Sequence, residues 1–380
     1  MMGRKPKLII MLLGLALTSV VAGCGRTTDG AGYAYNINTP VEAPPTNEEY
    51  IYDKSLLEVP LHDEYDNELY ADETTSALIE FAAYYFARLQ AMWDEDDGKM
   101  WGIPLHTPIV IVCRQTSTVA ANRPDSQHEF THYYIDGTAV YVSTLSMHIS
   151  RMERKAWDGQ IGIFIPLGLM QSYEWKGIGG FIGRTDRNLM QIIHYVMHAL
   201  QPSIMGVYGA YQMPPGHGRI YYHLEINALV YAATIDDRER AAAAIHDALS
   251  FRHIRRSIYH TDTAENQFKI SEGTAVYTEL RLVLNRNKIN EIVQKWKVEL
   301  VRQPGDAQVS FLYGYKAGAL YGILLDDFGV DWRAHINGLN TDLGYMLQNA
   351  LGITEFMPFD EIDVSRYGYS ELALSPTIRI

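Results

Sequence analysis

The chain has 380 residues, of which 47% are hydrophobic and 20% are charged, and its formal net charge is −13. This is the composition of a globular protein long enough to bury a large core, in one domain or in two closely packed lobes. The negative charge argues against nucleic acid as a partner. Phosphate binding requires a basic surface, and the sequence contains no basic stripe.

The N-terminal segment, residues 1–23, has the pattern of a secretion signal. Arg4, Lys5 and Lys7 precede a mainly apolar run of 15 residues, Leu8 to Ala22, which is short for a membrane span but suits a signal-peptide core. The run ends in Val-Ala-Gly-Cys24, which resembles the lipobox of bacterial lipoproteins, whose cysteine is diacylated and becomes the first mature residue. A plain secretion signal with a chance cysteine is the alternative. Loss of the three basic residues takes the charge to about −16 (−13 − 3).

Residues 24–72 are expected to form a flexible tether, because Thr, Asn, Gly, Pro and acidic residues dominate and no apolar period emerges. The folded domain is then expected over residues 73–380, with a β-rich part at about 100–184 and a helical part at about 185–380. Cys113 is the second of the two cysteines. With Cys24 lipidated it has no partner, so we expect no disulfide.

The first predicted elements are a helix over Glu73–Glu95 and a strand over Pro108–Cys113. One face of the helix is apolar at helical spacing, and the strand is a short continuous apolar run. Between them, the acidic segment Asp94–Gly98 lacks the alternation and the distal glutamate of a calcium-binding EF-hand loop. We interpret it as a solvated turn.

The segment His128–His132 matches H-E-x-x-H at every position, but its surroundings predict a strand. Arg-Pro-Asp-Ser-Gln precedes the motif, and Asp136-Gly137 follows between two runs of β-forming residues, a strong hairpin signal. On a strand, His128 and His132 share a face while Glu129 points away, so the helical metal geometry cannot form. We predict that these two histidines lie on a β-strand and bind no metal.

Further elements follow in order. Glycine-punctuated apolar segments between Gly159 and Arg184, GIFIPLGLM and EWKGIGGFIG, predict more strands. Helices are predicted over the segments Tyr222–Thr234, Asp236–Tyr259, the second half of Glu265–Leu284, and Tyr313–Phe328. No internal repeat is evident.

The segment Asn188–Gln201, NLMQIIHYVMHALQ, carries the most informative pattern. Its apolar residues recur at three- and four-residue intervals, which predicts a helix capped by Thr185 or Asp186 and stopped by Pro202. His194 and His198 are four residues apart, so both imidazoles project from one helix face. On spacing alone, two such histidines are more often core residues than ligands.

This segment resembles the H-E-x-x-H-A-L-Q helix of zincin metallopeptidases, with Tyr195 where the catalytic glutamate is expected. In gluzincins the third ligand is a glutamate on a later helix, in a Glu-Gly-x-Ala-x-Tyr setting that the segment Ser271–Tyr277 matches. The resemblance therefore implies zinc held by His194, His198 and Glu272, a set that leaves a fourth position open.

The longer pattern covers roughly residues 75–340 and is similar to bacterial proteins of gluzincin type. It implies an α+β, zincin-like fold, in which a mixed β lobe precedes a mainly helical lobe that carries the H-x-x-x-H and Glu-Gly helices. By the same resemblance Tyr315 is a transition-state hydrogen-bond donor, although a packed tyrosine is the plainer interpretation. Glu225 is a rival third ligand, or a carboxylate that holds an imidazole.

Catalysis depends on position 195. Peptide hydrolysis needs a carboxylate to take a proton and pass it to the leaving amine, and a tyrosine, with an ordinary pKa of about 10, is a poor base at neutral pH. One hypothesis is a surface-anchored zinc hydrolase with a relocated base, Glu225 or Glu279. The other is a degenerate lipoprotein that binds a peptide, a cell-wall component or a protein partner on the outer face of a bacterial membrane. A third hypothesis, a solute-binding protein, is supported only by the 26 tyrosines of the chain.

Overall fold

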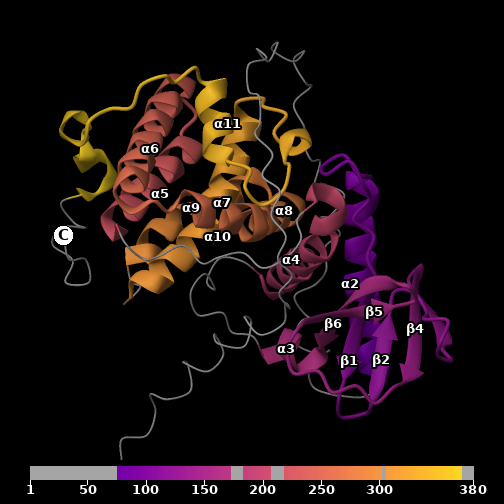
Figure 1. The fold of residues 1–380 in the computed structure, drawn as a ribbon. Helices are drawn as coiled ribbons and strands as arrows, with labels where there is room; N and C mark the ends of the chain where they lie inside the picture. Colours follow the sequence, from indigo (N-terminus) through magenta and orange to yellow (C-terminus); the bar gives the residue numbers. More distant parts are fainter. Residues whose placement is uncertain (1–74, 173–182, 207–217, 302–304, 370–380) are drawn as a thin grey trace, which may run out of the picture. The chain divides into compact units, whose positions relative to one another are not determined.

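The computed structural model describes residues 75–172, 183–206, 218–301 and 305–369. Within these ranges, a mixed six-stranded sheet with one covering helix comes first and a group of helices follows (Figure 1). The predicted α+β class is therefore confirmed. No helix in these ranges is long and apolar enough to cross a lipid bilayer.

The sheet has the strand order β3-β4-β2-β1-β6-β5, and β1 and β6 form its parallel pair. The strands are β1 (Ile109–Cys113), β2 (Thr118–Ala121), β3 (Thr131–Ile135), β4 (Thr138–Thr144), β5 (Glu153–Trp157) and β6 (Gln160–Pro166). The predicted strand at β1 is confirmed. All five of its residues are buried, as expected for a central strand covered on both faces. Ile109, Ile111 and Cys113 face the main core, and Cys113 is a free thiol.

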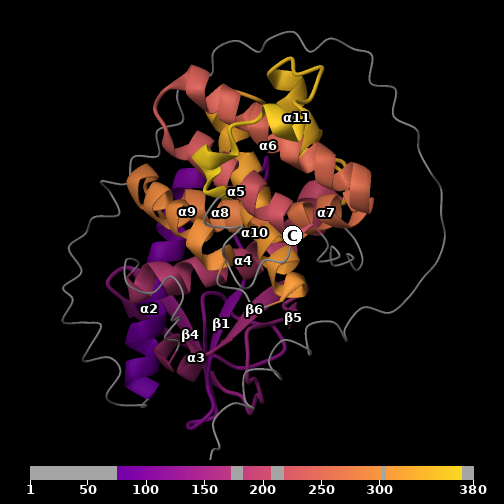
Figure 2. The same cartoon turned by 90° about the vertical axis from the view of Figure 1, so that its left-hand side faces the viewer.

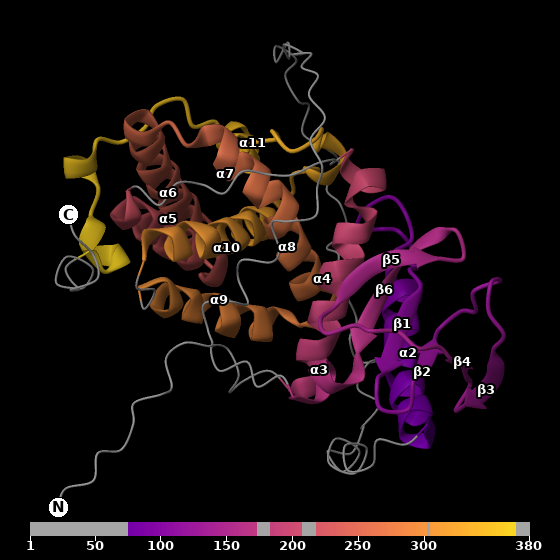
Figure 3. The same ribbon diagram turned by 60° about the horizontal axis from the view of Figure 1, so that its bottom comes forward.

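Helix α2 (Thr75–Asp96) covers one face of the sheet and contacts β1, β2 and β4 (Figure 3). It confirms the first predicted helix, and its buried face includes Phe81, Tyr85 and Leu89. The acidic segment Asp94–Gly98 is a solvated turn only in part, because its first three residues form the end of α2 and Asp96 is fully buried. Asp97 and Gly98 end the helix, with positive φ angles of 43° and 75°.

Two Asp-Gly turns join antiparallel pairs. Asp136-Gly137 connects β3 to β4 as predicted, with φ angles of 46° and 84°. Asp158-Gly159 connects β5 to β6 in the same way, and the sequence analysis missed β5. The predicted strand GIFIPLGLM was wrong in its second half, where the short helix α3 (Leu167–Ser172) follows β6. The predicted strand EWKGIGGFIG falls on residues 174–183, which lie outside the described ranges except for the last.

Among the remaining helices, α4, α5, α6, α8 and α10 confirm predicted helices with somewhat different bounds (Figures 1 and 2). They are α4 (Arg184–Met205), α5 (Arg219–Thr234), α6 (Arg238–Tyr259), α7 (Asp262–Phe268), the π-helix η2 (Lys269–Gly273), α8 (Thr274–Val283), α9 (Arg286–Val301), α10 (Asp306–Asp327) and α11 (Leu343–Ala350). The segment from 265 to 283 is thus helical throughout, rather than in its second half only. Helices α9 and α11 were not predicted.

Helix α4 differs from the prediction at both ends. It begins after Gly183 with no side-chain cap, so Thr185 and Asp186 lie inside its first turn instead of capping it. Pro202 does not stop it: the helix continues to Met205 and ends at Gly206, which has a left-handed conformation. A proline removes the hydrogen bond to the carbonyl four residues earlier, here that of His198. Arg154 of β5 replaces it, with Nη1 donating to that carbonyl at 2.9 Å.

Candidate metal centre

The histidine pair lies on helix α4, which packs between the sheet and α8 through contacts with β6 and α8. Three of its apolar residues, Ile193, Val196 and Met197, are fully buried. His194 and His198 point from the opposite face, and their side chains are 16% and 17% exposed. Their Nε2 atoms lie 3.1 Å apart. The spacing of four residues therefore brings the two imidazoles together, as the sequence indicated.

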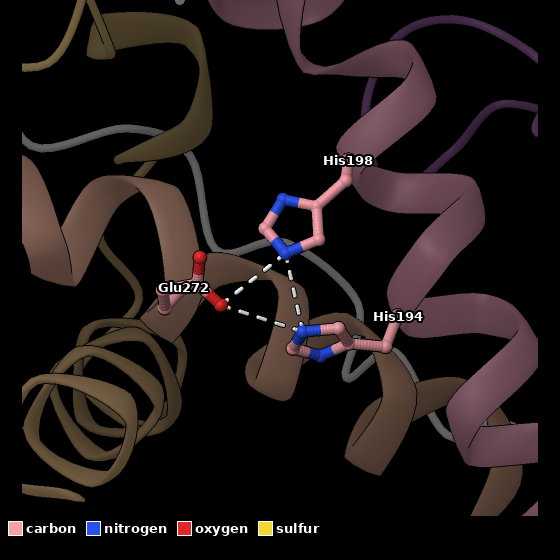
Figure 4. Close-up of side chains that lie close together, drawn as sticks. All are labelled: His194, His198 and Glu272. Atoms are coloured by element: carbon pink, nitrogen blue, oxygen red, sulfur yellow. Dashed lines mark hydrogen bonds and ion pairs between the residues drawn. The ribbon is translucent and has the colours of Figure 1, made fainter. Parts of the chain in front are cut away.

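Glu272 completes the group from the π-helix η2 (Figure 4). Its Oε2 atom lies 3.3 Å from Nε2 of His198 and 3.5 Å from Nε2 of His194. A π-helical turn inside an α-helix is uncommon and often marks a functional site. Here it places a carboxylate from a segment 74 residues further along the chain between two rings of α4.

The three ligand atoms suit a metal ion, and the ligand atoms of His194, His198 and Glu272 all lie within 4.8 Å of one another. In a tetrahedral site with bonds of about 2.0–2.2 Å, neighbouring ligand atoms are about 3.3–3.6 Å apart. The two distances to Glu272, 3.3 and 3.5 Å, fall in this range, and the 3.1 Å between the two imidazoles is slightly shorter. The donor set of two imidazoles and one carboxylate fits a divalent transition metal, and zinc readily accepts it.

Each imidazole is also held from behind. Nδ1 of His194 lies 3.1 Å from Oε2 of Glu279, on α8, and Nδ1 of His198 lies 3.0 Å from Oε1 of Gln201. Histidine ligands of metals usually donate their second N–H to a carboxylate, carbonyl or water, which fixes the ring orientation. Both histidines therefore have the surroundings typical of metal ligands.

The buried carboxylates of this group require a positive charge between them. Burial lowers the pKa of His194, but the hydrogen bonds and charges of Glu272 and Glu279 outweigh it and raise the pKa to about 10. Burial raises the pKa of Glu272, but His198 and His194 hold it well below its usual range. Burial keeps the pKa of Glu279 above its usual value. Glu272 is therefore ionised and ready to coordinate a cation.

The glycine after Glu272 has a packing reason. A Cβ atom on Gly273 would lie 2.5 Å from the Cα of Gly318 on α10, which is closer than two carbon atoms can approach. The absence of side chains at both positions lets α10 cross directly over η2. The Glu-Gly pair is thus a candidate ligand followed by the point at which α10 crosses η2.

Both tyrosines named in the sequence analysis lie beside His194. Tyr195 is partly buried next to it on α4, with ring centroids 6.3 Å apart. Tyr315 comes from α10 and stacks on the His194 ring at 6.0 Å, with an interplanar angle of 16°. Its ring also packs on Phe268 and Phe311. Tyr315 is therefore a packed residue that also borders the candidate metal centre.

Glu225 lies in a separate buried ionic cluster. Its side chain is fully buried on α5, where it is paired with Arg255 and accepts hydrogen bonds from the hydroxyls of Tyr313 and Tyr321, each at 2.7 Å. Burial opposes its ionisation, but Arg255 and Lys269 outweigh this and lower its pKa to about 2. Glu225 is not part of the three-residue metal group, and its hydrogen-bond partners among the described residues include no imidazole.

The H-E-x-x-H segment His128–His132 is not part of the metal group. His132 is on β3 as predicted, exposed and stacked on Tyr141, with ring centroids 4.7 Å apart. The prediction was wrong for His128, which precedes the strand in a bend where its Nδ1 lies 3.0 Å from Asp125. Neither residue belongs to the metal-ligand group found in the described ranges.

Sequence reasoning missed the roles of Gln201 and Arg154. Gln201 stood in the Ala-Leu-Gln match, and its position three residues after His198 is a signal for a side-chain contact on a helix. Arg154 carried no such signal, because its contact with the His198 carbonyl joins elements 44 residues apart. Glu279 was considered only as a relocated base, yet it holds His194.

Comparison of the chain with known protein families, with curated proteins and with solved structures finds no match.

Proposed function

We propose that this protein is a gluzincin-type, metallopeptidase-like lipoprotein that binds zinc through His194, His198 and Glu272 and hydrolyses peptides weakly or not at all. The observation that carries the proposal is the convergence of these three side chains at tetrahedral spacing, with both Nδ1 atoms engaged from behind. The zincin-like architecture is part of the proposal. It is supported by the order of elements: a mixed sheet, a helix with the histidines, and a later helix with the glutamate.

A zinc ion in such a site would supply Lewis acidity toward a substrate carbonyl and lower the pKa of water. The residues around it supply less. Tyr195 stands where zincins have the base, and a tyrosine hydroxyl is a poor base at neutral pH. By the resemblance to gluzincins, the Tyr315 hydroxyl would donate a hydrogen bond to a substrate oxygen. Proton transfer from water to a leaving amine therefore lacks its usual carboxylate.

The two carboxylates considered as replacement bases are engaged elsewhere. Glu279 contacts Nδ1 of His194, the ring nitrogen that faces away from the other two ligands. Glu225 is enclosed by Arg255 and two tyrosines. These contacts favour a protein that binds a peptide or a protein partner over an active hydrolase with a relocated base.

Metal analysis of the purified protein tests the site. We expect about one zinc per chain, with little peptidase activity against a panel of unstructured peptides. Zinc absent from the protein even after growth with excess metal contradicts the assignment, and the two histidines are then ordinary helix residues. Efficient peptide hydrolysis by the natural sequence contradicts the loss of catalysis, while leaving the metal site in place.

The membrane anchor is tested separately. We propose that lipid on Cys24 holds the protein on the outer face of a bacterial membrane, since two acyl chains anchor stably where one is marginal. Cys24→Ala should move the protein from the membrane fraction to the soluble fraction. A variant that still sediments with membranes contradicts lipidation at this residue.

A further inference from the structure

Gln201 joins the two halves of the candidate metal centre. It is 3% exposed at the end of α4, and its amide contacts both α4 and η2. Oε1 lies 3.0 Å from Nδ1 of His198. Nε2 donates to the carbonyl of Ser271 at 2.5 Å and lies 3.2 Å from Oγ1 of Thr274. One side chain thus links a metal-ligating histidine to the residue that precedes Glu272.

These partners fix which nitrogen of His198 carries the proton. The Ser271 carbonyl can only accept a hydrogen bond, so it must face the NH₂ group of the Gln201 amide. The amide oxygen then faces His198, and an oxygen can only accept, so Nδ1 must be the donor. In the neutral ring this leaves Nε2 with a free lone pair, directed toward Nε2 of His194 and Oε2 of Glu272.

The same amide supports the π-helix. A π-helical turn shifts its carbonyls relative to α-helical donors. Two carbonyls of η2 accept side-chain hydrogen bonds: Ile270 from Oγ1 of Thr274 at 2.6 Å, and Ser271 from Nε2 of Gln201. On the other side, the contact between Gly273 and Gly318 presses α10 against this turn. The carboxylate of Glu272 is therefore aimed by a turn that Gln201 holds from α4.

We infer that Gln201 is a positioning residue that sets the proton position of His198 and, through Ser271, the placement of Glu272 for metal binding. This inference rests on the proposed metal site. Because one amide serves both ligands, its two ends act together. A side chain that keeps only the contact with His198 restores half of the arrangement and leaves the Ser271 carbonyl facing a second acceptor.

The test compares three variants of the full chain: Gln201→Met, Gln201→Glu and, as matched control, Gln191→Met, which replaces a partly buried glutamine of the same helix. Gln201→Met should lower zinc affinity about 10- to 100-fold, the range for partners of ligating histidines. Gln201→Glu at pH 8 still accepts from Nδ1 but opposes Ser271, so it should also lose at least about 10-fold. Cobalt-substituted protein should show a changed visible spectrum in both variants, and Gln191→Met should match the natural protein.

Each outcome decides something. Natural zinc affinity in Gln201→Met overturns the inference. Natural affinity in Gln201→Glu alone limits Gln201 to orienting His198 and overturns the link to Glu272. If the natural protein binds no zinc, the proposed function fails, and hydrogen exchange of the metal-free protein then tests the link. Amides of residues 269–274 should exchange faster in Gln201→Met than in Gln191→Met, and equal exchange overturns the inference.

Discussion

Two segments of this chain share the spacing His-x-x-x-His. The segment that matches H-E-x-x-H at every position lacks the helical geometry that brings two histidines together. His128-Glu129-Phe130-Thr131-His132 contains the glutamate of a zinc peptidase but runs from a bend into the edge strand β3. His194-Tyr195-Val196-Met197-His198 lacks the glutamate but lies on one turn of α4. Only the second pair belongs to the metal-ligand group found in the described ranges.

The difference teaches that backbone period outranks residue identity. Four residues bring side chains together on a helix, where one turn takes 3.6 residues, and set them about 13 Å apart along a strand. A carboxylate partner does not decide the matter. Asp125 contacts Nδ1 of His128 at 3.0 Å, much as Glu279 contacts Nδ1 of His194 at 3.1 Å. What the first segment lacks is a second and third ligand facing the same point.

The largest effect is expected when the second segment receives the glutamate that it lacks. Tyr195→Glu places a carboxylate beside the candidate metal without altering a ligand. If the substrate groove is intact, peptidase activity should rise by about 10²–10⁴-fold, the range for a general base. Tyr195→Gln, which has the same length but cannot take up a proton, is the control. A Tyr195→Glu protein that binds zinc and stays inert instead favours a binding role.

Removing one histidine from each segment tests the comparison directly. His194→Ala and His198→Ala should each lower zinc affinity by more than about 100-fold, because a lost ligand weakens binding more than a lost partner of a ligand. His128→Ala and His132→Ala should leave it unchanged. Equilibrium dialysis with a zinc chelator measures all four. Loss of zinc in His128→Ala, with zinc retained in His194→Ala, would reverse the assignment.

A smaller effect is expected from the carboxylates behind the histidines. Glu279→Gln keeps an acceptor for Nδ1 of His194 but removes the charge, so zinc affinity should fall about 10- to 100-fold. Asp125→Asn makes the same change behind His128 and should have no effect on zinc. Equal behaviour of the two variants in a zinc titration would show that Glu279 has no part in the metal site.

The order of strands and helices and the helix of the histidine pair could be predicted because they depend on local apolar periods, whereas the α+β class came from the resemblance to gluzincins. Glu272 came from its Glu-Gly setting, not from periodicity, since no local pattern relates residues 74 positions apart. The prediction that Pro202 stops the helix was wrong, because Arg154 of β5 donates a hydrogen bond to the carbonyl that the proline leaves without its helical partner. The role of Glu225 also depends on residues distant in the sequence, because its partners Arg255 and Tyr313 are 30 and 88 residues away.

The smallest effect is expected at the crossing of α10 over η2. The segment His128–His132 has no comparable crossing. A Cβ atom on Gly318 would lie 2.6 Å from the Cα of Gly273 and 2.7 Å from the carbonyl oxygen of Lys269. Both are backbone atoms, so Gly318→Ala can be accommodated only if α10 moves away from η2. Overpacking of this kind costs about 1–3 kcal/mol, which outweighs the gain of up to about 1 kcal/mol that alanine brings to a helix.

The movement should also shift Glu272 slightly, so zinc affinity should fall by less than the roughly 10-fold expected for a lost partner of a ligand. Gly168→Ala on α3 is the control, because a Cβ atom there meets nothing within 4 Å and alanine should be neutral or stabilising. Urea denaturation of the metal-free proteins measures the first effect, and zinc titration the second. If Gly318→Ala is as stable as Gly168→Ala, α10 does not press on η2, and the Glu-Gly pair loses its packing explanation.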